Sequence, residues 1–461
     1  MNVLVTGASG YIGSHLVPEL LWSGHTVRCL SRQPDNLYLP TQVERFRGDV
    51  LDRETLAKSL DGVDVAYYLV HSMERAQRES RSFAERDRIA AGNFAEMAAK
   101  AGVRRIIYLG GLGDHDKSMS EHLSSRIEVG RILQNGTVPT TVFCAAIIVG
   151  PWGSSFQMMQ YLTQRLPIMI TPRWVETQCQ PIALSDVLFY LVHCLDVPDA
   201  AGRTLDIGGP DILSYREMMM RLATVLGRRR RIIGVPVLSP RLSSYWVNLV
   251  TPVSASIARP LIDGLKTPVV CRDRSILGLM PHDCLPYEAS VRRALDQQGH
   301  GKITRQGRGY ELRWEQKVSH TPEQVMDFFA DPMNLAPMTP PKLLFRLQEP
   351  FPRQLSAGTE LNYRLRVLGI PMHWTTLISA WEPPSLFKDT QLRGPYRLWQ
   401  HTHTFTKQQD GTWVHDQVRY ELPPGWMGRL AHAFLIARQL RSIFRFRSRQ
   451  FPRLLIRHRS L

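Results

Sequence analysis

The sequence predicts two successive units, an α/β unit with a doubly wound parallel sheet and then an α+β unit with an antiparallel sheet. Short apolar runs alternate with helical patterns over about the first 150 residues. The segment 296–309 (DQQGHGKITRQGRG) is polar and glycine-rich, as expected of a linker between domains. Beyond it several strand-like runs follow one another, and six of the ten tryptophans of this 461-residue chain occur there. The predicted boundaries are therefore 1–295, a linker at 296–309, and 310–461.

The first thirteen residues, MNVLVTGASGYIG, have the pattern of a strand, a tight turn and a helix. An apolar run from Val3 to Val5 is followed by Gly7, Gly10 and Gly13 at three-residue spacing. Glycines in this context are typical of a dinucleotide-binding turn. Gly7 permits the turn, Gly10 removes a Cβ from the path of a pyrophosphate, and Gly13 lets helix and strand pack closely. The helix N-terminus would offer N–H groups to the phosphates.

The end of the second predicted strand, Thr26 to Ser31, bears on which dinucleotide binds. An acidic residue there binds the ribose 2′-OH of NAD, whereas a basic one pairs with the 2′-phosphate of NADP. Arg32 occupies this place, so NADP(H) is favoured. Asp35 lies close by and Arg32 has an alternative role as a solvated loop arginine, so NAD(H) stays open.

Further strands and helices complete a parallel sheet. An almost continuous apolar run over 63–70 predicts a buried parallel strand. His71, Ser72 and Met73 follow it, at the carboxyl edge where ligands collect in open α/β sheets. The other predicted elements are strands over 44–47 and 105–109 and helices from Asp52 and over 80–101.

Four segments of this unit, TGASGYIG (6–13), GDV (48–50), YYLVHSM (67–73) and IIYLGGLG (106–113), resemble the short-chain dehydrogenase/reductase superfamily. The resemblance covers roughly residues 1–295, is strongest to the atypical, NmrA-like branch, and implies a Rossmann fold with a substrate-side lobe at 151–295. It also implies a set of cofactor contacts. These would be Gly7, Ser9, Gly10, Tyr11, Ile12 and Gly13 at the pyrophosphate, Arg32 at the 2′-phosphate, Asp49 and Val50 at the adenine, and Leu69 and Val70 on the adenosine side.

The catalytic pattern of that superfamily is replaced in this chain. Where a Tyr-x-x-x-Lys pair is expected, the sequence has His122-x-x-x-Arg126, and the preceding strand ends in glycines without a hydroxyl group. Arg126 could keep the ribose contact but cannot shuttle protons, because guanidinium stays protonated. His122 has a near-neutral pKa in water and is the candidate acid/base. The alternative is that both residues coat a helix beside the nucleotide; His71 and His115 are further candidates, or rim histidines.

The lobe at 151–295 contains two other features. Phe156, Met158, Met159 and Trp174 either line an apolar pocket or belong to the ordinary core. The proline-broken, amphipathic stretch 239–265 predicts a lid over the cleft or a membrane-surface face.

The second unit begins with a strand at 310–318 and a helix capped by Thr321 and ending near Phe329. A long helix over 427–446 ends the predicted order. Together they predict a helix-grip: a curved sheet wrapped on the final helix around a cavity. The intervening strands are predicted at 343–348, 360–368, 374–381, 386–391, 401–406 and 412–421.

This half resembles the START-like (SRPBCC) superfamily, which includes polyketide cyclases, over about residues 308–448. The resemblance implies an apolar ligand cavity. It rests on Phe328, Phe329, Pro332 to Leu335, Thr339 to Pro341, Gly358, Thr359, Asp389, Gly394 to Tyr396, Trp399, His401, His403, Phe405, Gly411, Thr412 and Asp416.

His401 and His403 share one face of a strand. They lack a carboxylate or cysteine at fixed spacing, so no metal site is predicted. Histidines bonded to backbone, or polar contacts to a cavity ligand, are expected instead.

The net charge of +16 is concentrated at one end. The nine arginines between 427 and 461 meet no acidic residue, which leaves +7 for the other 426 residues. One interpretation is a packed helix with arginines that snorkel to solvent. Another is contact of the tail beyond Phe446 with an anionic membrane. Nucleic acid is not expected, because no binding module accompanies the charge.

The remaining composition points to the cytoplasm, with the inner membrane face as a place of peripheral contact. Six scattered cysteines without CxxC spacing indicate reduced thiols. A strand from residue 2 leaves no room for a signal peptide, and no apolar run reaches the ~18–20 residues of a membrane span.

These observations predict an NAD(P)H-dependent oxidoreductase or epimerase-type enzyme for an apolar small molecule, with a second unit that binds a hydrophobic ligand. The alternative is a redox-silent NADP(H)-binding sensor or assembly protein that binds a lipid or quinone-like ligand.

Overall fold

The first sheet is built around β1 (Asn2–Thr6), which pairs in parallel with both β2 and β4. In the computed structural model the sheet has seven strands in the order β11-β6-β5-β4-β1-β2-β3, and all its pairings are parallel. This is the doubly wound order predicted from the sequence. The other strands are β2 (Thr26–Ser31), β3 (Glu44–Arg47), β4 (Val65–Tyr68), β5 (Arg105–Gly111), β6 (Thr140–Ala145) and β11 (Thr204–Ile207).

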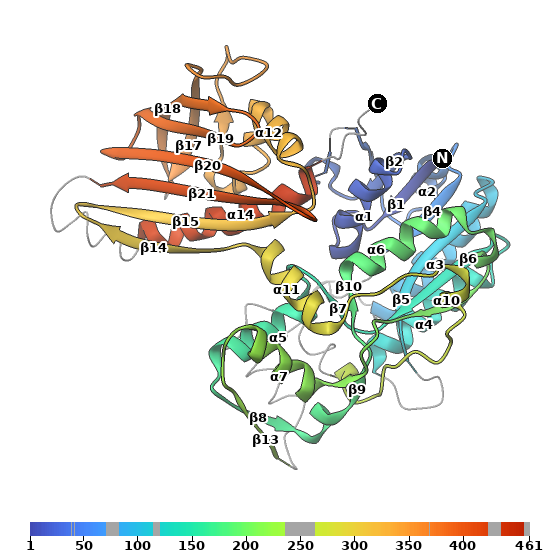
Figure 1. The fold of residues 1–461 in the computed structure, drawn as a ribbon. Coiled ribbons are helices and arrows are strands. Elements are labelled where there is room, and N and C mark those ends of the chain that lie inside the picture. The colour runs from blue at the N-terminus through green and yellow to red at the C-terminus, as the bar shows by residue number, and fades with distance from the viewer. Residues whose placement is uncertain are drawn as a thin grey trace. The chain divides into compact units, whose positions relative to one another are not determined.

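The structure describes residues 1–37, 39–40, 42–70, 83–113, 120–235, 263–367, 369–422 and 435–455. They form two compact units, Met1–Ala294 and Leu295–Leu461 (Figure 1). None of the helices in these ranges has both the length and the apolar character needed to cross a bilayer. All six cysteines are free thiols, as predicted.

Helices cover both faces of the parallel sheet (Figure 1). On one face α1 (Tyr11–Trp22) and α6 (Leu184–His193) pack into one apolar core. On the other face lie α2 (Arg53–Leu60), α3 (Phe83–Lys100) and α4 (Glu121–Gln134). All four residues of β4 are buried, because a parallel strand between two helical layers is shielded on both sides.

The segment after β6 adds small elements beside the sheet. Phe156, Met158 and Met159 are buried there, while the Trp174 side chain and 236–262 lie outside the described residues. The helices are α5 (Ser154–Arg165), α7 (Tyr215–Val225), α10 (Ile276–Leu279) and α11 (Tyr287–Gln298). The strand pairs are β7 (Ile148–Val149) with β10 (Ile182–Ala183), β9 (Gln178–Cys179) with β12 (Leu213–Ser214), and β8 (Ile168–Pro172) with β13 (Arg231–Val235).

The second unit is an antiparallel sheet of eight strands in the order β14-β15-β21-β20-β19-β18-β17-β16. Its strands are β14 (His300–Gln306), β15 (Gly309–Val318), β16 (Arg346–Leu347), β17 (Glu360–Val367), β18 (Ile370–Glu382), β19 (Leu386–Arg393), β20 (Leu398–Gln408) and β21 (Gly411–Glu421). The predicted helix after β15 is α12 (Pro322–Ala330), and the predicted cap is confirmed. The Thr321 hydroxyl accepts the N–H of Gln324, whose side chain returns to the Thr321 N–H.

The segment 296–309, predicted as a linker between domains, contains regular elements in the structure. Residues up to Gln298 continue α11, and β14 follows as an edge strand paired with β15. Strand β14 is polar and mostly exposed. Hydrogen bonds to a neighbouring strand, rather than apolar alternation, therefore hold this segment.

The predicted end of the last helix is also wrong. Helix α14 runs Ala437–Leu454, eight residues past the predicted end at Phe446. Phe451, Leu454 and Leu455 are buried in the core of this unit, so the tail up to residue 455 is not a free basic segment. The exposed face of α14 carries Arg438, Arg441, Arg445 and Arg449. Contact of the tail beyond Phe446 with an anionic membrane stays a prediction.

Candidate functional site

The glycine turn between β1 and α1 leaves no room for side chains. Gly7 has a φ of +73°, and a Cβ there would lie 2.5 Å from the Leu69 carbonyl oxygen. A Cβ on Gly13 would overlap the Gly7 carbonyl and lie 2.9 Å from Ala8 Cα. The Gly10 N–H donates to the Gly7 carbonyl at 2.8 Å, and a Cβ at Gly10 would approach that same oxygen at 2.9 Å. At these glycines the backbones of the strand, the turn and the helix are in direct contact, so a side chain in place of any of the three would clash with backbone atoms.

The first turn of α1 presents backbone N–H groups to the carboxyl edge of the sheet. Its N-cap Gly10 supplies no side-chain cap, and the first turn carries no acidic residue. The Ser14 N–H donates to the Gly10 carbonyl at 3.0 Å, so the earlier N–H groups of the helix precede its hydrogen-bond ladder. Ser9 and Gly10 are exposed at this point. This arrangement suits an anion such as a pyrophosphate.

The Tyr11 side chain turns away from this cradle toward the turn between β7 and α5. A Cβ on Gly150 would overlap the Tyr11 hydroxyl, and one on Gly153 would lie 3.0 Å from Tyr11 Cζ. The ring also meets His15 edge-on, with centroids 5.2 Å apart. The backbone N–H of Tyr11 can bind a pyrophosphate, while its ring packs on Gly150 and Gly153.

Thr6 is a site residue that the sequence analysis missed. Its buried hydroxyl donates to the Tyr67 carbonyl at 3.0 Å and accepts the Leu69 N–H at 3.3 Å. These bonds hold the half-buried Leu69 and Val70 beside the glycine turn. The signal in the sequence is a hydroxyl residue directly before the first glycine.

Two arginines lie together at the ends of β2 and β3. Arg32 is exposed just after β2, and Arg47 ends β3 in register with Ser31. Arg47 donates to the Arg32 carbonyl at 3.4 Å and pairs with Asp35 at 2.7 Å. The sequence analysis missed Arg47, although its strand (ERFR) is unusually basic. Asp35, which kept NAD(H) open, forms an exposed ion pair with Arg47.

The next predicted contacts, Asp49 and Val50, differ in character. The Asp49 carboxylate accepts the Leu51 N–H at 3.0 Å, and its own N–H donates to the Thr55 hydroxyl at 3.3 Å. Val50 is 9% exposed and packs in the core. Asp49 thus shapes the turn after β3, and Val50 anchors it.

Arg126 lies over the carboxyl end of β5. Its Nη2 donates to the Leu109 carbonyl at 2.6 Å, while its carbonyl accepts from the Tyr108 hydroxyl at 3.0 Å. A Cβ on Gly111 would come within 3.6 Å of the Arg126 Cδ and Nε. Arg126 Nε is buried and has no hydrogen-bond partner among the described residues. Burial raises the pKa of Tyr108 to about 12, so its phenol stays neutral.

His122 precedes Arg126 by one helical turn. The Ser120 hydroxyl caps α4 by accepting the Leu123 N–H at 3.3 Å. His122 is half-buried, and its four-residue spacing from Arg126 places both on one side of the helix. The other histidine candidates, His71 and His115, lie outside the described residues.

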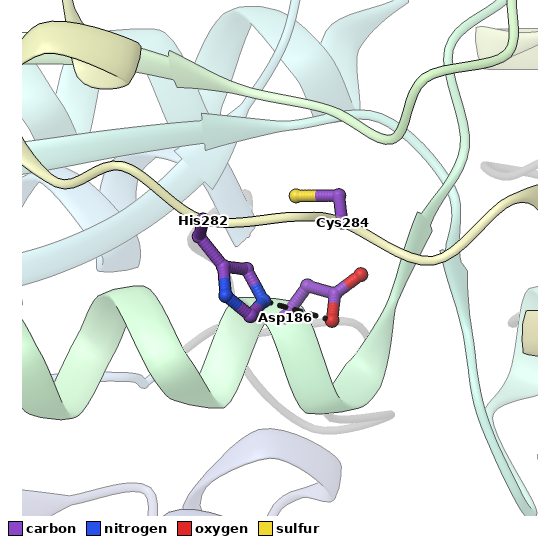
Figure 2. A group of neighbouring side chains, drawn as sticks. All are labelled: Asp186, His282 and Cys284. Carbon is purple, nitrogen blue, oxygen red and sulfur yellow. Dashed lines mark hydrogen bonds and ion pairs between the residues drawn. The ribbon is translucent and has the colours of Figure 1, made fainter.

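A cluster away from the cradle joins α6 to the segment before α11 (Figure 2). The Asp186 carboxylate accepts the Leu285 N–H at 2.9 Å and lies 3.2 Å from His282 Nε2. Phe189 stacks on the His282 ring, with centroids 3.9 Å apart. Burial raises the pKa of the Cys284 thiol, so it is not a ready thiolate ligand. We interpret this cluster as structural: it ties the segment before α11 to α6. Asp186, Phe189, His282 and Leu285 are called the clasp below.

The second unit contains a cavity of about 360 Å³ between its sheet and α14. Asp389, His401 and His403 form a polar patch in its wall, and Arg447 reaches it from α14. The rest of the wall is largely apolar, and includes Leu335, Met338, Leu361, Ile378, Ile443 and Phe444.

The polar patch is buried and charged. His401 and His403 are 4% and 2% exposed. Burial lowers the pKa of His401, and the neighbouring His403 lowers it further. Burial alone would lower the pKa of His403 as well, but the Asp416 and Asp389 carboxylates together outweigh burial and raise that pKa. The two imidazoles therefore differ in their affinity for a proton.

Residues 7–135 match a family model described as NAD(P)H-binding. The N-terminal unit contains an NAD(P)H-binding domain. The matched range runs from the glycine turn through β2 to β5 and includes His122 and Arg126 on α4. The glycine cradle, Arg32 and Arg47 therefore also lie within it.

Curated relatives agree with this assignment. A 3 beta-hydroxysteroid dehydrogenase/Delta 5→4-isomerase of Mycobacterium tuberculosis is 30% identical over 182 residues, which cover 34% of this chain and 49% of that protein. A (4-alkanoyl-5-oxo-2,5-dihydrofuran-3-yl)methyl phosphate reductase of Streptomyces griseus is 26% identical over 60% of this chain and 93% of that protein. The chain spans about half the length of the first relatives that it matches.

A solved structure, the Citrobacter sp. triphenylmethane reductase complexed with NADP(H), shares the fold. It aligns with a TM-score of 0.51 and 17% identity over 64% of this chain and all of that chain. The likeness supports the Rossmann topology of the N-terminal unit.

Proposed function

We propose that the chain is an NADP(H)-dependent oxidoreductase or epimerase-type enzyme for an apolar small molecule. The observation that carries this proposal is Arg126, whose buried Nε finds no partner among the described residues and which lies at the same carboxyl edge of the sheet as the glycine cradle. A buried guanidinium N–H without an acceptor costs about 1–3 kcal/mol. A ribose hydroxyl of the cofactor would supply the missing acceptor.

The cradle itself fits the cofactor's phosphates, since a Cβ at any of its three glycines would approach backbone atoms within 3 Å. When bound, the nicotinamide supplies the hydride acceptor or donor. The chain's own part is to hold the ribose of the cofactor through Arg126. This would keep the reacting nicotinamide near the carboxyl end of β5. Arg126 stays protonated at neutral pH and cannot transfer a proton, so His122 is the residue that we assign to proton transfer.

The names of two relatives, a dehydrogenase/isomerase and a reductase, support redox chemistry. For the second unit we propose binding of a hydrophobic ligand. Its sheet, α14 and the largely apolar cavity between them support the START-like, helix-grip interpretation.

Two arginines where the ribose 2′-phosphate would lie support NADP(H) over NAD(H). We expect Arg32→Ala and Arg47→Ala each to weaken NADPH binding about tenfold, because each removes an exposed charge-assisted contact. NADH binding should change by less than about twofold, since NADH lacks this phosphate. Fluorescence titration of both nucleotides measures this. Arg104→Ala is the matched control, because Arg104 pairs with Asp64 at the opposite edge of the sheet. Equal losses for NADH and NADPH would contradict the assignment.

The enzyme proposal predicts NADPH oxidation with hydrophobic carbonyls or quinones. His122→Gln should lower that rate about 100-fold, the usual scale of a lost acid/base group, without changing NADPH affinity. His193→Gln on the exposed end of α6 is the control. Native mass spectrometry of the purified chain would identify retained nucleotide and ligand together. Tight NADPH binding without turnover over a broad panel would instead support the redox-silent alternative.

A further inference from the structure

Strand register brings four charged or titratable side chains of the second unit onto one face of its sheet. Asp389 on β19 is directly opposite His401 on β20, and Asp416 on β21 is directly opposite His403. Directly opposed residues share a face, as do residues two apart on one strand. The four side chains therefore form a square across three neighbouring strands.

Three ligand atoms of this square converge. Asp389 Oδ2 lies 3.4 Å from His401 Nδ1 and 3.5 Å from His403 Nε2. All three atoms lie within 4.8 Å of one another. Nitrogen and oxygen ligands about 2.1 Å from a tetrahedral Zn²⁺ are about 3.4 Å apart. The spacing is thus that of ligands around one small cation.

The opposite nitrogens of both rings face the fourth residue. His401 Nε2 and His403 Nδ1 lie 3.0 and 2.6 Å from the same Asp416 oxygen. Metal-binding histidines usually direct their second nitrogen to a carboxylate, which fixes the ring and its tautomer. With the proton of His401 on Nε2, where it bonds to Asp416, the Nδ1 lone pair points toward the Asp389 carboxylate. The same tautomer of His403 would place its Nε2 lone pair toward that carboxylate. Lone pairs and a carboxylate repel one another. A cation bound between these nitrogens and the Asp389 carboxylate would replace that repulsion with coordination bonds.

The convergent atoms face the cavity. Asp389, His401 and His403 line it, whereas Asp416 is not part of its wall. Trp374, also in the wall, has a buried indole N–H without an acceptor among the described residues. A fourth coordination position would thus open to the cavity, whose wall also contains this unused hydrogen-bond donor.

We propose that Asp389, His401 and His403 bind one divalent transition metal ion, that Asp416 positions both imidazoles, and that the open coordination position faces the cavity. Two histidines and one carboxylate with an open position are a donor set that suits Zn²⁺ or Fe²⁺. The ion would hold an oxygen donor of a molecule in the cavity. This inference stands apart from nicotinamide chemistry in the first unit.

Untagged full-length protein, stripped with chelator, tests the site by calorimetric titration with Zn²⁺ and by the visible absorption of added Co²⁺. We expect a single Zn²⁺ per chain and Co²⁺ bands of a low-coordinate site. Asp389→Asn, which keeps size and shape, should weaken Zn²⁺ binding at least about 100-fold, and Asp416→Asn about 10- to 100-fold.

Two controls keep the result interpretable. His415→Gln changes a histidine of β21 outside the square and should bind Zn²⁺ as the unmodified chain does. His282→Gln tests the clasp of Figure 2, the other group of possible ligands. Melting temperature and NADPH affinity of each variant report folding and the first unit separately.

Failure to bind Zn²⁺ or Co²⁺ in a folded chain would overturn the proposal, and the square would then be an ion-paired cluster that shares protons. Zn²⁺ binding that survives Asp389→Asn, or that His282→Gln removes, would overturn it equally. Loss of NADPH turnover alone would leave the metal result unchanged, so the two proposals fail separately.

Discussion

Gly13→Ala is expected to lower NADPH affinity at least about 100-fold. This is the loss expected when two hydrogen bonds to charged phosphate oxygens are removed. The added Cβ would overlap the Gly7 carbonyl and approach Ala8 Cα within 2.9 Å. Both obstacles are backbone atoms, so the clash is relieved only if α1 moves away from β1. That movement takes the N–H groups of the first turn away from the phosphates. The same displacement should cost about 1–3 kcal/mol of stability.

Gly92→Ala is the matched control for this substitution. Gly92 lies within α3 of the same unit, and a Cβ there meets no atom within 4 Å. Alanine in an open helix position should raise stability by about 0.5–1 kcal/mol and leave NADPH binding unchanged. Chemical denaturation and fluorescence titration of both variants give the comparison. Normal NADPH affinity in Gly13→Ala would show that the cofactor does not use this turn.

Asp186→Ala should destabilise the first unit by about 2–4 kcal/mol, because it removes a buried hydrogen-bond acceptor and leaves a small cavity. The Asp186 carboxylate is the acceptor for the Leu285 N–H and lies 3.2 Å from His282. Removing it leaves a partly buried donor unpaired and releases the segment from α6. Hydrogen exchange at the Leu285 amide should therefore rise more than exchange in the central strands.

Two variants define what the carboxylate does. Asp186→Asn keeps an acceptor for Leu285 and should cost less than Asp186→Ala. Asp199→Ala removes an exposed acid and should be nearly neutral. If Asp186→Ala were as stable as Asp199→Ala, the clasp interpretation would be wrong.

Local chemistry made much of the fold predictable. The glycine turn, the buried run of β4 and the Thr321 cap each depend on residues within a few positions of one another. Strand β14 was not predictable from such patterns, because it is a polar edge strand held by the backbone of β15. The end of helix α14 was predicted too early because Phe451 and Leu454 pack into the unit beyond a run of arginines.

The candidate sites divide in the same way. His122 and Arg126 follow from helical spacing, and the cradle follows from glycine spacing. Arg47 was missed because it reaches Arg32 only through the pairing of β3 with β2. The prediction of no metal site rested on the absence of a carboxylate near His401 in sequence. Asp389 and Asp416 are brought to it by strand register, which the sequence alone does not specify.

The Tyr11 ring on Gly150 and Gly153 makes two parts of the first unit thermodynamically linked. Tyr11 begins the helix that forms the cradle, and the two glycines precede α5. Their lack of side chains lets the ring fit closely, so the turn cannot shift without moving the start of α1. Any ligand that repositions this turn must change nucleotide affinity, and nucleotide must change affinity for that ligand by the same factor. Cooperativity between nucleotide and such a ligand would thus arise within one small aromatic contact.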